Sequence, residues 1–232
     1  MKLLRNARLA WLAVGCALAA TSVNAQVAPT ASEAAQYQGL HAAAQAGDTK
    51  RIATLASSGA DVDARDKHGR TPLHVATFAK QRDAIQALVR AGGKPDLLES
   101  DRYDTVTIAA VANDEETLRL LLGLGASAKQ VTSRYDGTAL IAAAHLGHAG
   151  VVRQLIAAGA PLDHVNNLHW TAAIESIVLG DGGPRHQATL KALVDAGANL
   201  HLADREGRTP LQLAQARGYG EMVKLLEAAG GR

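Results

Sequence analysis

A glycine followed by alanine or by a second glycine recurs along most of this 232-residue chain at nearly equal intervals. Successive pairs begin 33, 33, 34, 38 and 33 residues apart, at Gly59, Gly92, Gly125, Gly159, Gly197 and Gly230. A fixed period of about 20 to 50 residues is typical of stacked, quasi-one-dimensional architectures. We therefore expect a solenoid, whose exposed faces and loop tips favour a binding surface over a catalytic pocket.

The repeated unit is clearest in its second and last copies. The second copy has Thr-Pro-Leu-His at 71–74 and an apolar segment at 84–92, and the last has Thr-Pro-Leu at 209–211 and a similar segment at 222–226. A capping threonine, a proline at the first helical position and a closing glycine predict two short helices per unit. The pattern resembles the ankyrin repeat, whose unit is a β-turn with two antiparallel helices. The resemblance implies an all-α solenoid with short β-hairpin fingers.

Three segments are expected along the chain: a signal peptide at 1–25, a short N-terminal segment at 26–34 and an ankyrin-repeat domain at 35–232. The first unit lacks a preceding finger. We expect it to cap the stack together with a helix from about Ser32, because Thr30 and Glu33 have the spacing of a capping box. The predicted units are about 35–65, 66–98, 99–131, 132–165, 166–203 and 204–232.

The last unit carries polar residues that should face water, as terminal repeats must. These residues are Gln212, Gln215, Arg217, Glu221, Lys224 and Glu227.

The N-terminus has the three regions of a secretory signal peptide. Three basic residues precede an apolar run at 9–20, and Val-Asn-Ala at 23–25 suits cleavage before Gln26. A periplasmic location is therefore predicted, with secretion as the alternative. An uncleaved anchor and lipidation of Cys16, which follows Ala-Val-Gly, are the other interpretations.

Signal cleavage changes the charge and the cysteine content. It removes Lys2, Arg5 and Arg8, so that 24 basic residues become 21 against 22 acidic residues and the net charge falls from +2 to −1. The sequence has no clustered basic face, so neither nucleic acid nor, after cleavage, a membrane is an expected partner. Without Cys16, the mature chain has no thiol for a disulfide, a nucleophile or a metal.

The nine histidines do not form a catalytic or metal-binding pattern. His74 and His148 occupy family positions in the repeat, and Gly147 should end the helix between His145 and His148, which argues against a shared metal face. No Gly-x-Ser-x-Gly motif or comparable constellation supplies a nucleophile. We therefore predict that the protein is not an enzyme and has no cofactor or metal.

Three consecutive fingers depart from the glycine-centred turn. Residues 102–104 and 134–136 both read Arg-Tyr-Asp, and His169-Trp170 occupies the next finger. Tyrosine, tryptophan and arginine are enriched at interface hot spots. A second interpretation is that the aromatic rings pack on neighbouring fingers, which is favoured for Trp170 and equally open for Tyr103 and Tyr135. The predicted protein-binding residues are Phe78, Arg102, Tyr103, Asp104, Arg134, Tyr135, Asp136, His145, His169, Trp170 and Glu175.

An insertion at 180–186 accounts for the 38-residue interval and is expected to lengthen the turn between the two helices of the fifth unit. It is either a tolerated surface insertion or a loop that shapes one end of the binding surface. The overall prediction is a monomeric interaction module that binds another protein through its concave face and fingers. The alternative is a periplasmic inhibitor or immunity protein that occludes an enzyme.

Overall fold

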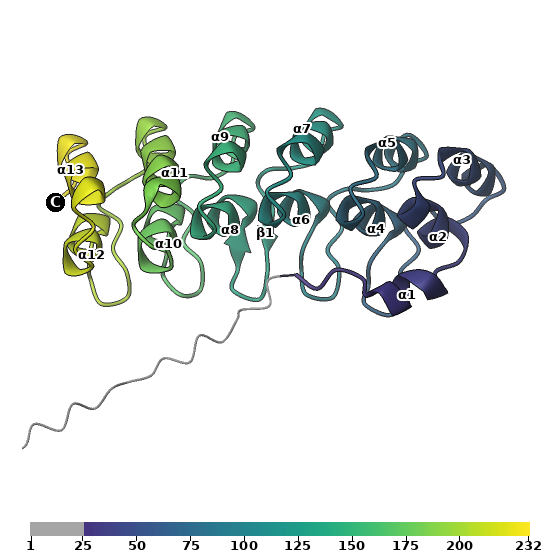
Figure 1. Ribbon diagram of the computed structural model, residues 1–232, viewed down its shortest axis with the longest axis horizontal. Helices are drawn as coiled ribbons and strands as arrows, with labels where there is room; N and C mark the ends of the chain where they lie inside the picture. The colour runs from purple at the N-terminus through teal and green to yellow at the C-terminus, as the bar shows by residue number, and fades with distance from the viewer. Residues whose placement is uncertain (1–25) are drawn as a thin grey trace, which may run out of the picture.

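Six helix pairs stack side by side in chain order (Figure 1). The computed structural model describes residues 26–232, and the predicted signal peptide with Cys16 lies outside the described residues. The first helices of the units form one row and the second helices form the other, which confirms the predicted helical solenoid. The pairs are α2 (Gly39–Ala46) with α3 (Thr49–Ser57), α4 (Pro72–Phe78) with α5 (Arg82–Arg90), α6 (Thr105–Val111) with α7 (Glu115–Gly123), α8 (Ala139–His145) with α9 (Ala149–Ala157), α10 (Ala172–Val178) with α11 (Pro184–Asp195), and α12 (Pro210–Ala216) with α13 (Gly220–Ala228).

Short polar side chains begin the first helix of most units. A threonine hydroxyl accepts from the backbone N–H three residues later at Thr71, Thr138, Thr171 and Thr209. This hydrogen bond satisfies one of the amides that a helix N-terminus leaves without an internal partner. The predicted closing glycines follow the second helices with φ between 79° and 99°, a left-handed conformation that glycine adopts without steric cost.

The core runs without interruption along the stack, between the two rows of helices. Leucine and isoleucine side chains such as Leu73, Ile85 and Leu88 are fully buried. One alanine in the first helix of each of four units is also fully buried and lets neighbouring helices approach closely; these residues are Ala76, Ala110, Ala143 and Ala214. Within 26–232, the longest helices fall short of the length and apolar character needed to cross a bilayer.

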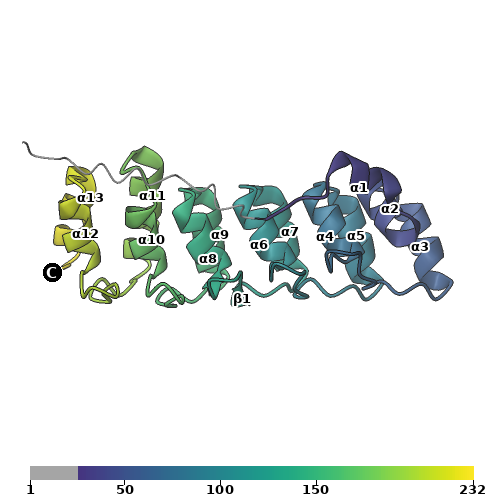
Figure 2. The same ribbon diagram turned by 90° about the horizontal axis from the view of Figure 1, so that it is seen from below.

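The fingers project from one edge of the stack, beside the first helices (Figure 2). Each finger is numbered by the unit that it begins, so the fingers are the second to the sixth. In the fourth finger, β1 (Val131–Thr132) pairs antiparallel with β2 (Gly137–Thr138). Backbone hydrogen bonds join neighbouring fingers: Ser100 N–H to His68 O at 3.0 Å, Ser133 N–H to Arg102 O at 2.9 Å, and Asn167 N–H to Tyr135 O at 2.9 Å. The fingers of units two to five are therefore joined in one row by backbone hydrogen bonds, and the Arg205 side chain links the last finger through Asn167 O at 3.0 Å.

A short helix, α1 (Ala31–Gln36), covers the N-terminal end of the stack. It begins one residue before the predicted Ser32, and Thr30 and Glu33 form the predicted capping box. Glu33 also lies 3.1 Å from Lys67 Nζ and 2.6 Å from His68 Nε2 of the second finger. The Thr30 amide, Lys67 and His68 together hold the pKa of Glu33 well below its ordinary value.

At the other end, the predicted polar residues of the last unit are exposed, as expected for a terminal repeat; they are Gln212, Gln215, Arg217, Glu221, Lys224 and Glu227.

The insertion lengthens the turn between α10 and α11, as predicted, and it also extends the helix that follows. The turn before α11 has five residues, 179–183, where most other units have three, and α11 has 12 residues where the other second helices from α3 to α13 have nine. Two inserted residues thus lie in the turn and three extend the helix. Pro184 begins the longer helix, a position where a missing N–H costs nothing.

Candidate protein-binding groove

Four of the five fingers are closed by a carboxylate or amide side chain at the first finger position. Asp66, Glu99, Asn166 and Asp204 each accept hydrogen bonds from two backbone N–H groups of their own finger. In the fourth finger, Ser133 accepts one such bond. These closures hold each finger in a defined shape against the first helices.

In every finger, the residue three positions after the closing residue has a left-handed backbone conformation; we call this the fourth position of the finger. Glycine occupies it in the second and last units, at Gly69 and Gly207, and Arg102 (φ 66°), Asp136 (φ 52°) and His169 (φ 63°) occupy it in units three to five. A residue with a Cβ is strained there by roughly 1–2 kcal/mol. The three middle fingers thus carry a side chain where the outer fingers have none, at a cost in backbone energy.

The two Arg-Tyr-Asp strings lie in adjacent fingers, as predicted, but they do not occupy equivalent positions within them. Relative to the finger closures, the second string is shifted by two residues, so Arg102 and Asp136 occupy the same finger position. Arg102 Nη1 lies 2.9 Å from Asp136 Oδ1, and this ion pair joins the third and fourth fingers.

Asp104 is not available to a partner, which corrects its prediction as a contact residue. Asp104 is 1% exposed, and its Oδ1 accepts a hydrogen bond from Thr107 N–H at 2.7 Å, which caps the start of α6. The other oxygen, Oδ2, is buried and has no hydrogen-bond partner. Burial raises the pKa of Asp104 to about 6, so this carboxylate is a helix cap that faces the interior.

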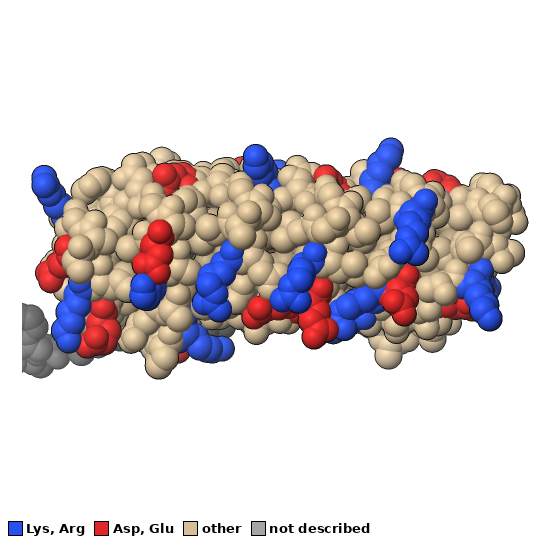
Figure 3. All heavy atoms as spheres, turned by 90° about the horizontal axis from the view of Figure 1, so that it is seen from above, with Lys and Arg blue, Asp and Glu red and all other residues tan. Residues whose placement is uncertain are grey.

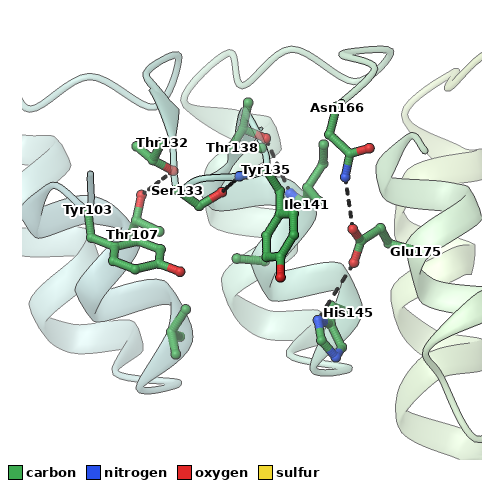
Figure 4. A pocket seen from close by; sticks show the side chains of 13 residues that line it. Tyr103, Thr107, Thr132, Ser133, Tyr135, Thr138, Ile141, His145, Asn166 and Glu175 are labelled. Carbon is green, nitrogen blue, oxygen red and sulfur yellow. Dashed lines mark hydrogen bonds and ion pairs between the residues drawn. The ribbon is translucent and has the colours of Figure 1, made fainter. Parts of the chain in front are cut away.

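Tyr103 and Tyr135 converge on one small pocket in the groove formed by the first helices and the fingers (Figure 4). Both residues are half-buried, and the pocket has a volume of about 70 Å³. Its other walls come from α6, α8, α10 and the fingers, through Thr107, Val111, Thr132, Ser133, Gly137, Thr138, Ile141, Ala142, His145, Asn166 and Glu175. The pocket brings together four predicted residues, namely Tyr103, Tyr135, His145 and Glu175.

Glu175 is a buried carboxylate in the wall of this pocket. Glu175 is 6% exposed. Its Oε1 accepts a hydrogen bond from Asn166 Nδ2 at 3.0 Å, and its Oε2 lies 3.6 Å from His145 Nδ1. Burial raises the pKa of Glu175 to about 7, against the opposing effect of the Asn166 hydrogen bond. Burial, together with nearby His186, holds the pKa of His145 below its ordinary value. At neutral pH the imidazole is therefore uncharged, and the carboxyl group is close to its titration midpoint.

The remaining predicted residues lie outside this pocket. Phe78 ends α4 and is partly buried, and Trp170 packs against the core, as its packing interpretation requires. Arg134 is exposed and lies 3.6 Å from Asp101, and His169 is exposed at its finger tip. These side chains are distributed along the row of fingers.

Asn166 was not among the predicted residues, although the sequence carries a signal for it. Asp66, Glu99 and Asp204 close three other fingers at this position, whereas the fifth unit has an amide. Only the amide can close the finger with its oxygen and also donate to Glu175 with its nitrogen. Other missed pocket residues, such as Thr107 and Thr132, are small polar residues with no distinctive pattern in the sequence.

Within residues 26–232, the histidine and acidic side chains do not gather in groups of three or more that could hold a metal ion. On the face formed by the second helices, basic and acidic side chains are interspersed (Figure 3). That face therefore lacks the single-sign basic stripe by which proteins bind nucleic-acid phosphates.

The fold and groove define a class of protein, the helical repeat proteins that present an extended concave surface. Two family models, described as ankyrin repeats in many copies and ankyrin repeats in three copies, match residues 40–89 with 184–227 and residues 106–201. The chain belongs to the ankyrin-repeat family. Ankyrin repeats are protein interaction modules and are typically non-catalytic.

Relatives from bacteria cover nearly the whole repeat domain. The ankyrin repeat protein YahD of Escherichia coli (strain K12) is 35% identical over 189 residues, which are 81% of this chain and 94% of YahD. The crystal structure of an ankyrin repeat domain from Acinetobacter baumannii AYE has a TM-score of 0.78 and 44% identity, and the match covers 83% of this chain and 98% of that one. A second ankyrin repeat protein structure, EF0377, has a TM-score of 0.75 and 31% identity, with 82% and 98% covered.

Proposed function

We propose that this protein binds a partner protein through the groove of units three to five, with the fingers and first helices as its contact surface. One observation carries this proposal: Tyr103 and Tyr135, from adjacent fingers, line the same pocket while remaining partly accessible. Tyrosines of this kind supply much of the free energy of protein interfaces, because a large ring is buried at a small cost in side-chain entropy.

The rigidity of the fingers supports the same proposal. Backbone hydrogen bonds join neighbouring fingers, and the Arg102–Asp136 ion pair adds a link between the third and fourth. A surface that is ordered before binding loses less conformational entropy when the partner docks. Arg102, Asp136 and His169, whose backbone is left-handed, place a guanidinium, a carboxylate and an imidazole at the tips of this ordered row.

We further propose that the partner lies in the periplasm. The support is the sequence of residues 1–25, with its basic start, apolar run and small residues before Gln26. Cell fractionation followed by N-terminal sequencing tests this location. A product that begins at Gln26 in the periplasmic fraction is expected, and a full-length cytoplasmic product would overturn the proposal.

The binding experiment uses residues 26–232 as bait in a periplasmic extract, followed by affinity measurements on the captured protein. Replacing Tyr103 and Tyr135 together by alanine should weaken the complex by more than about 2 kcal/mol, because both rings leave the interface. A matched Tyr→Phe double variant keeps the rings and should retain most of the affinity.

Far-UV circular dichroism must show the same helical content in all three proteins. An alanine double variant that folds normally and binds with unchanged affinity would contradict the proposed contact surface.

A further inference from the structure

Glu175 departs from its repeat position, which is the fourth residue of the first helix. The equivalent residues in the other units are Ala42, Val75, Ile108, Ala142 and Leu213. An apolar side chain there packs without difficulty, whereas a buried carboxylate loses its hydration and raises the free energy of the folded state. A group that breaks the packing pattern in this way is a candidate for function.

Only one of the two carboxylate oxygens of Glu175 accepts a hydrogen bond. Asn166 donates to Oε1 and at the same time closes its finger. Oε2 has no hydrogen bond, with His145 Nδ1 at 3.6 Å as its nearest ion-pair partner. Figure 4 shows the carboxylate pointing from α10 toward α8, between Asn166 and His145. A carboxylate oxygen without a donor therefore faces the pocket.

A positive charge is the missing complement of this site. Of the 13 residues that line the pocket, Glu175 is the sole carboxylate, and lysine and arginine are absent among them. His145 is uncharged at neutral pH because burial and His186 lower its pKa. The tyrosine rings of the same pocket attract cations through their negative faces. The pocket thus offers a carboxylate and two aromatic rings without a cation of its own.

The pocket volume restricts what can enter. The pocket measures about 70 Å³. Sites for small-molecule ligands measure about 300–1,000 Å³. Only the end of a side chain fits. A planar guanidinium suits this site better than an ammonium, because it can stack on an aromatic ring while it donates to a carboxylate.

We propose that this pocket receives the guanidinium group of an arginine that projects from the partner protein, with Glu175 as its counter-ion and Tyr103 and Tyr135 as its walls. The inference rests on the proposed function, because it specifies the chemistry of the partner. Binding of the cation favours the ionised form of Glu175, so the carboxyl group releases its proton when the arginine enters.

Few titratable groups compete for this role. From α8, His145 faces the carboxylate, and His186 of α11 is hydrogen-bonded to Asp181 and to the carbonyl of His145. The fingers contribute the phenols of Tyr103 and Tyr135, and burial raises the pKa of Tyr103 further. The neighbouring helix α12 supplies no residue of the pocket lining. Glu175 is therefore the group whose ionisation near neutral pH should control binding.

The test uses N-acetyl-arginine amide as the probe, with NMR shifts of the Ile141 methyl groups and the Tyr103 and Tyr135 rings as the readout. N-acetyl-citrulline amide is the matched neutral probe. We expect saturable shifts with the arginine probe and at least about tenfold weaker binding of the citrulline probe, because only the guanidinium pairs with the carboxylate. Equal binding of the two probes would overturn the inference.

The pH dependence provides a second readout. With a pKa of about 7, Glu175 is about one-tenth ionised at pH 6 and about nine-tenths ionised at pH 8. The affinity for the arginine probe should therefore fall about tenfold from pH 8 to pH 6. A Glu175→Gln variant should bind at least about tenfold more weakly than the wild type at pH 8 and lose this pH dependence.

The control variant is Glu206→Gln, which removes an exposed carboxylate from the last finger, outside the pocket. It should bind the probe like the wild type. Far-UV circular dichroism and amide spectra establish that both variants are folded.

The outcomes separate this inference from the proposed function. If the Glu175→Gln variant holds a captured partner as tightly as the wild type does, the arginine site is wrong and the groove function stands. If the arginine probe binds through Glu175 but alanine at Tyr103 and Tyr135 leaves the partner affinity unchanged, the proposed contact surface fails and the arginine site stands.

Discussion

At the residue scale, two buried carboxylates with raised pKa values have different roles. Asp104 caps α6 and lies in the interior, where threonine caps the first helices of units two, four, five and six. Glu175 lies in the wall of the groove pocket and keeps one oxygen without a hydrogen bond. Burial raises both pKa values, and only the geometry separates a helix cap from a candidate contact. A raised pKa alone therefore does not identify a functional site.

Asp104→Thr should stabilise the protein at neutral and alkaline pH. The folded-state pKa of about 6 exceeds the ordinary value of 3.8, so the folded chain binds more protons than the unfolded chain between these values. The cost of Asp104 is thus absent below pH 3.8, grows as the pH rises and is complete above pH 6, where it is on the order of 3 kcal/mol. Urea denaturation should show the variant to be more stable at pH 8 by up to this amount.

The difference in stability between Asp104→Thr and the wild type should disappear near pH 3.5. The control is Thr209→Asp, at the less buried cap of the last unit, whose stability should depend much less on pH. A stability gain of Asp104→Thr that does not depend on pH would show that the ionised carboxylate is not its cause.

At the element scale, the turns between paired helices are joined by side chains that reach back to the preceding unit. His148 contacts Ala110 O at 3.0 Å, His186 contacts His145 O at 2.9 Å, and Tyr219 donates to Gly180 O at 3.0 Å. The inserted turn retains this contact, because its helix extension supplies His186 and its glycine-rich loop packs against the Tyr219 ring at Gly182. The insertion is therefore accommodated by preserving the link between units.

Tyr219→Phe tests the value of one such link. The ring remains packed against Gly182, while the hydroxyl that donates to Gly180 O is lost. A single hydrogen bond of this kind contributes about 1 kcal/mol, so the free energy of unfolding should fall by about that amount. Urea denaturation measures the change, and Tyr37→Phe, which removes the hydroxyl that donates to Asp66, is the matched variant at the other end of the stack. An unchanged Tyr219→Phe stability would show that water replaces the bond.

At the scale of the whole molecule, each unit contacts mainly its neighbours, so the two ends need separate protection. The last unit exposes polar side chains, whereas the first two units are covered by α1 and the segment before it. Arg70 of the second finger is 2% exposed, and its Nη2 donates to Val27 O at 2.6 Å. Its Nη1 lies 3.7 Å from Glu33 and 3.6 Å from Asp66. The N-terminal segment thus neutralises a buried guanidinium as well as covering the core.

Removing residues 26–36 should destabilise the N-terminal units without changing the distant ones. Arg70 then loses Val27 and Glu33 and retains Asp66 as its carboxylate partner. Hydrogen exchange in α2 and α4 should accelerate at least about tenfold, whereas α12 and α13 should be unaffected, because stability in a repeat array is a sum of local terms. Hydrogen–deuterium exchange measured by mass spectrometry resolves the units.

Glu33→Gln in the full chain is the control for charge alone and should produce a smaller effect in the same helices. Uniform acceleration along the whole stack would instead show that the protein unfolds as one cooperative unit.

Local chemistry explains why so much of the fold could be predicted. The closing glycines, the capping threonines and the Thr30–Glu33 capping box act within a few residues of their own position, and the structure has them where the pattern indicated. The relative register of the two Arg-Tyr-Asp strings could not be predicted, because identical strings look equivalent in a linear alignment. Their alignment depends on which residue closes each finger and on hydrogen bonds to the neighbouring finger.

The period of the chain predicted a stacked solenoid, and the Thr-Pro-Leu motif with its helix signals predicted the ankyrin family and the units that break the pattern. These signals are encoded in residues close together in the sequence. The groove pocket required the folded molecule. Tyr103, Tyr135, His145 and Glu175 come from three units, and they line the same pocket only because the units stack. Burial is likewise a tertiary property: it turned Asp104 into an interior cap and left Glu175 with a single hydrogen bond, from Asn166, in the wall of the groove pocket.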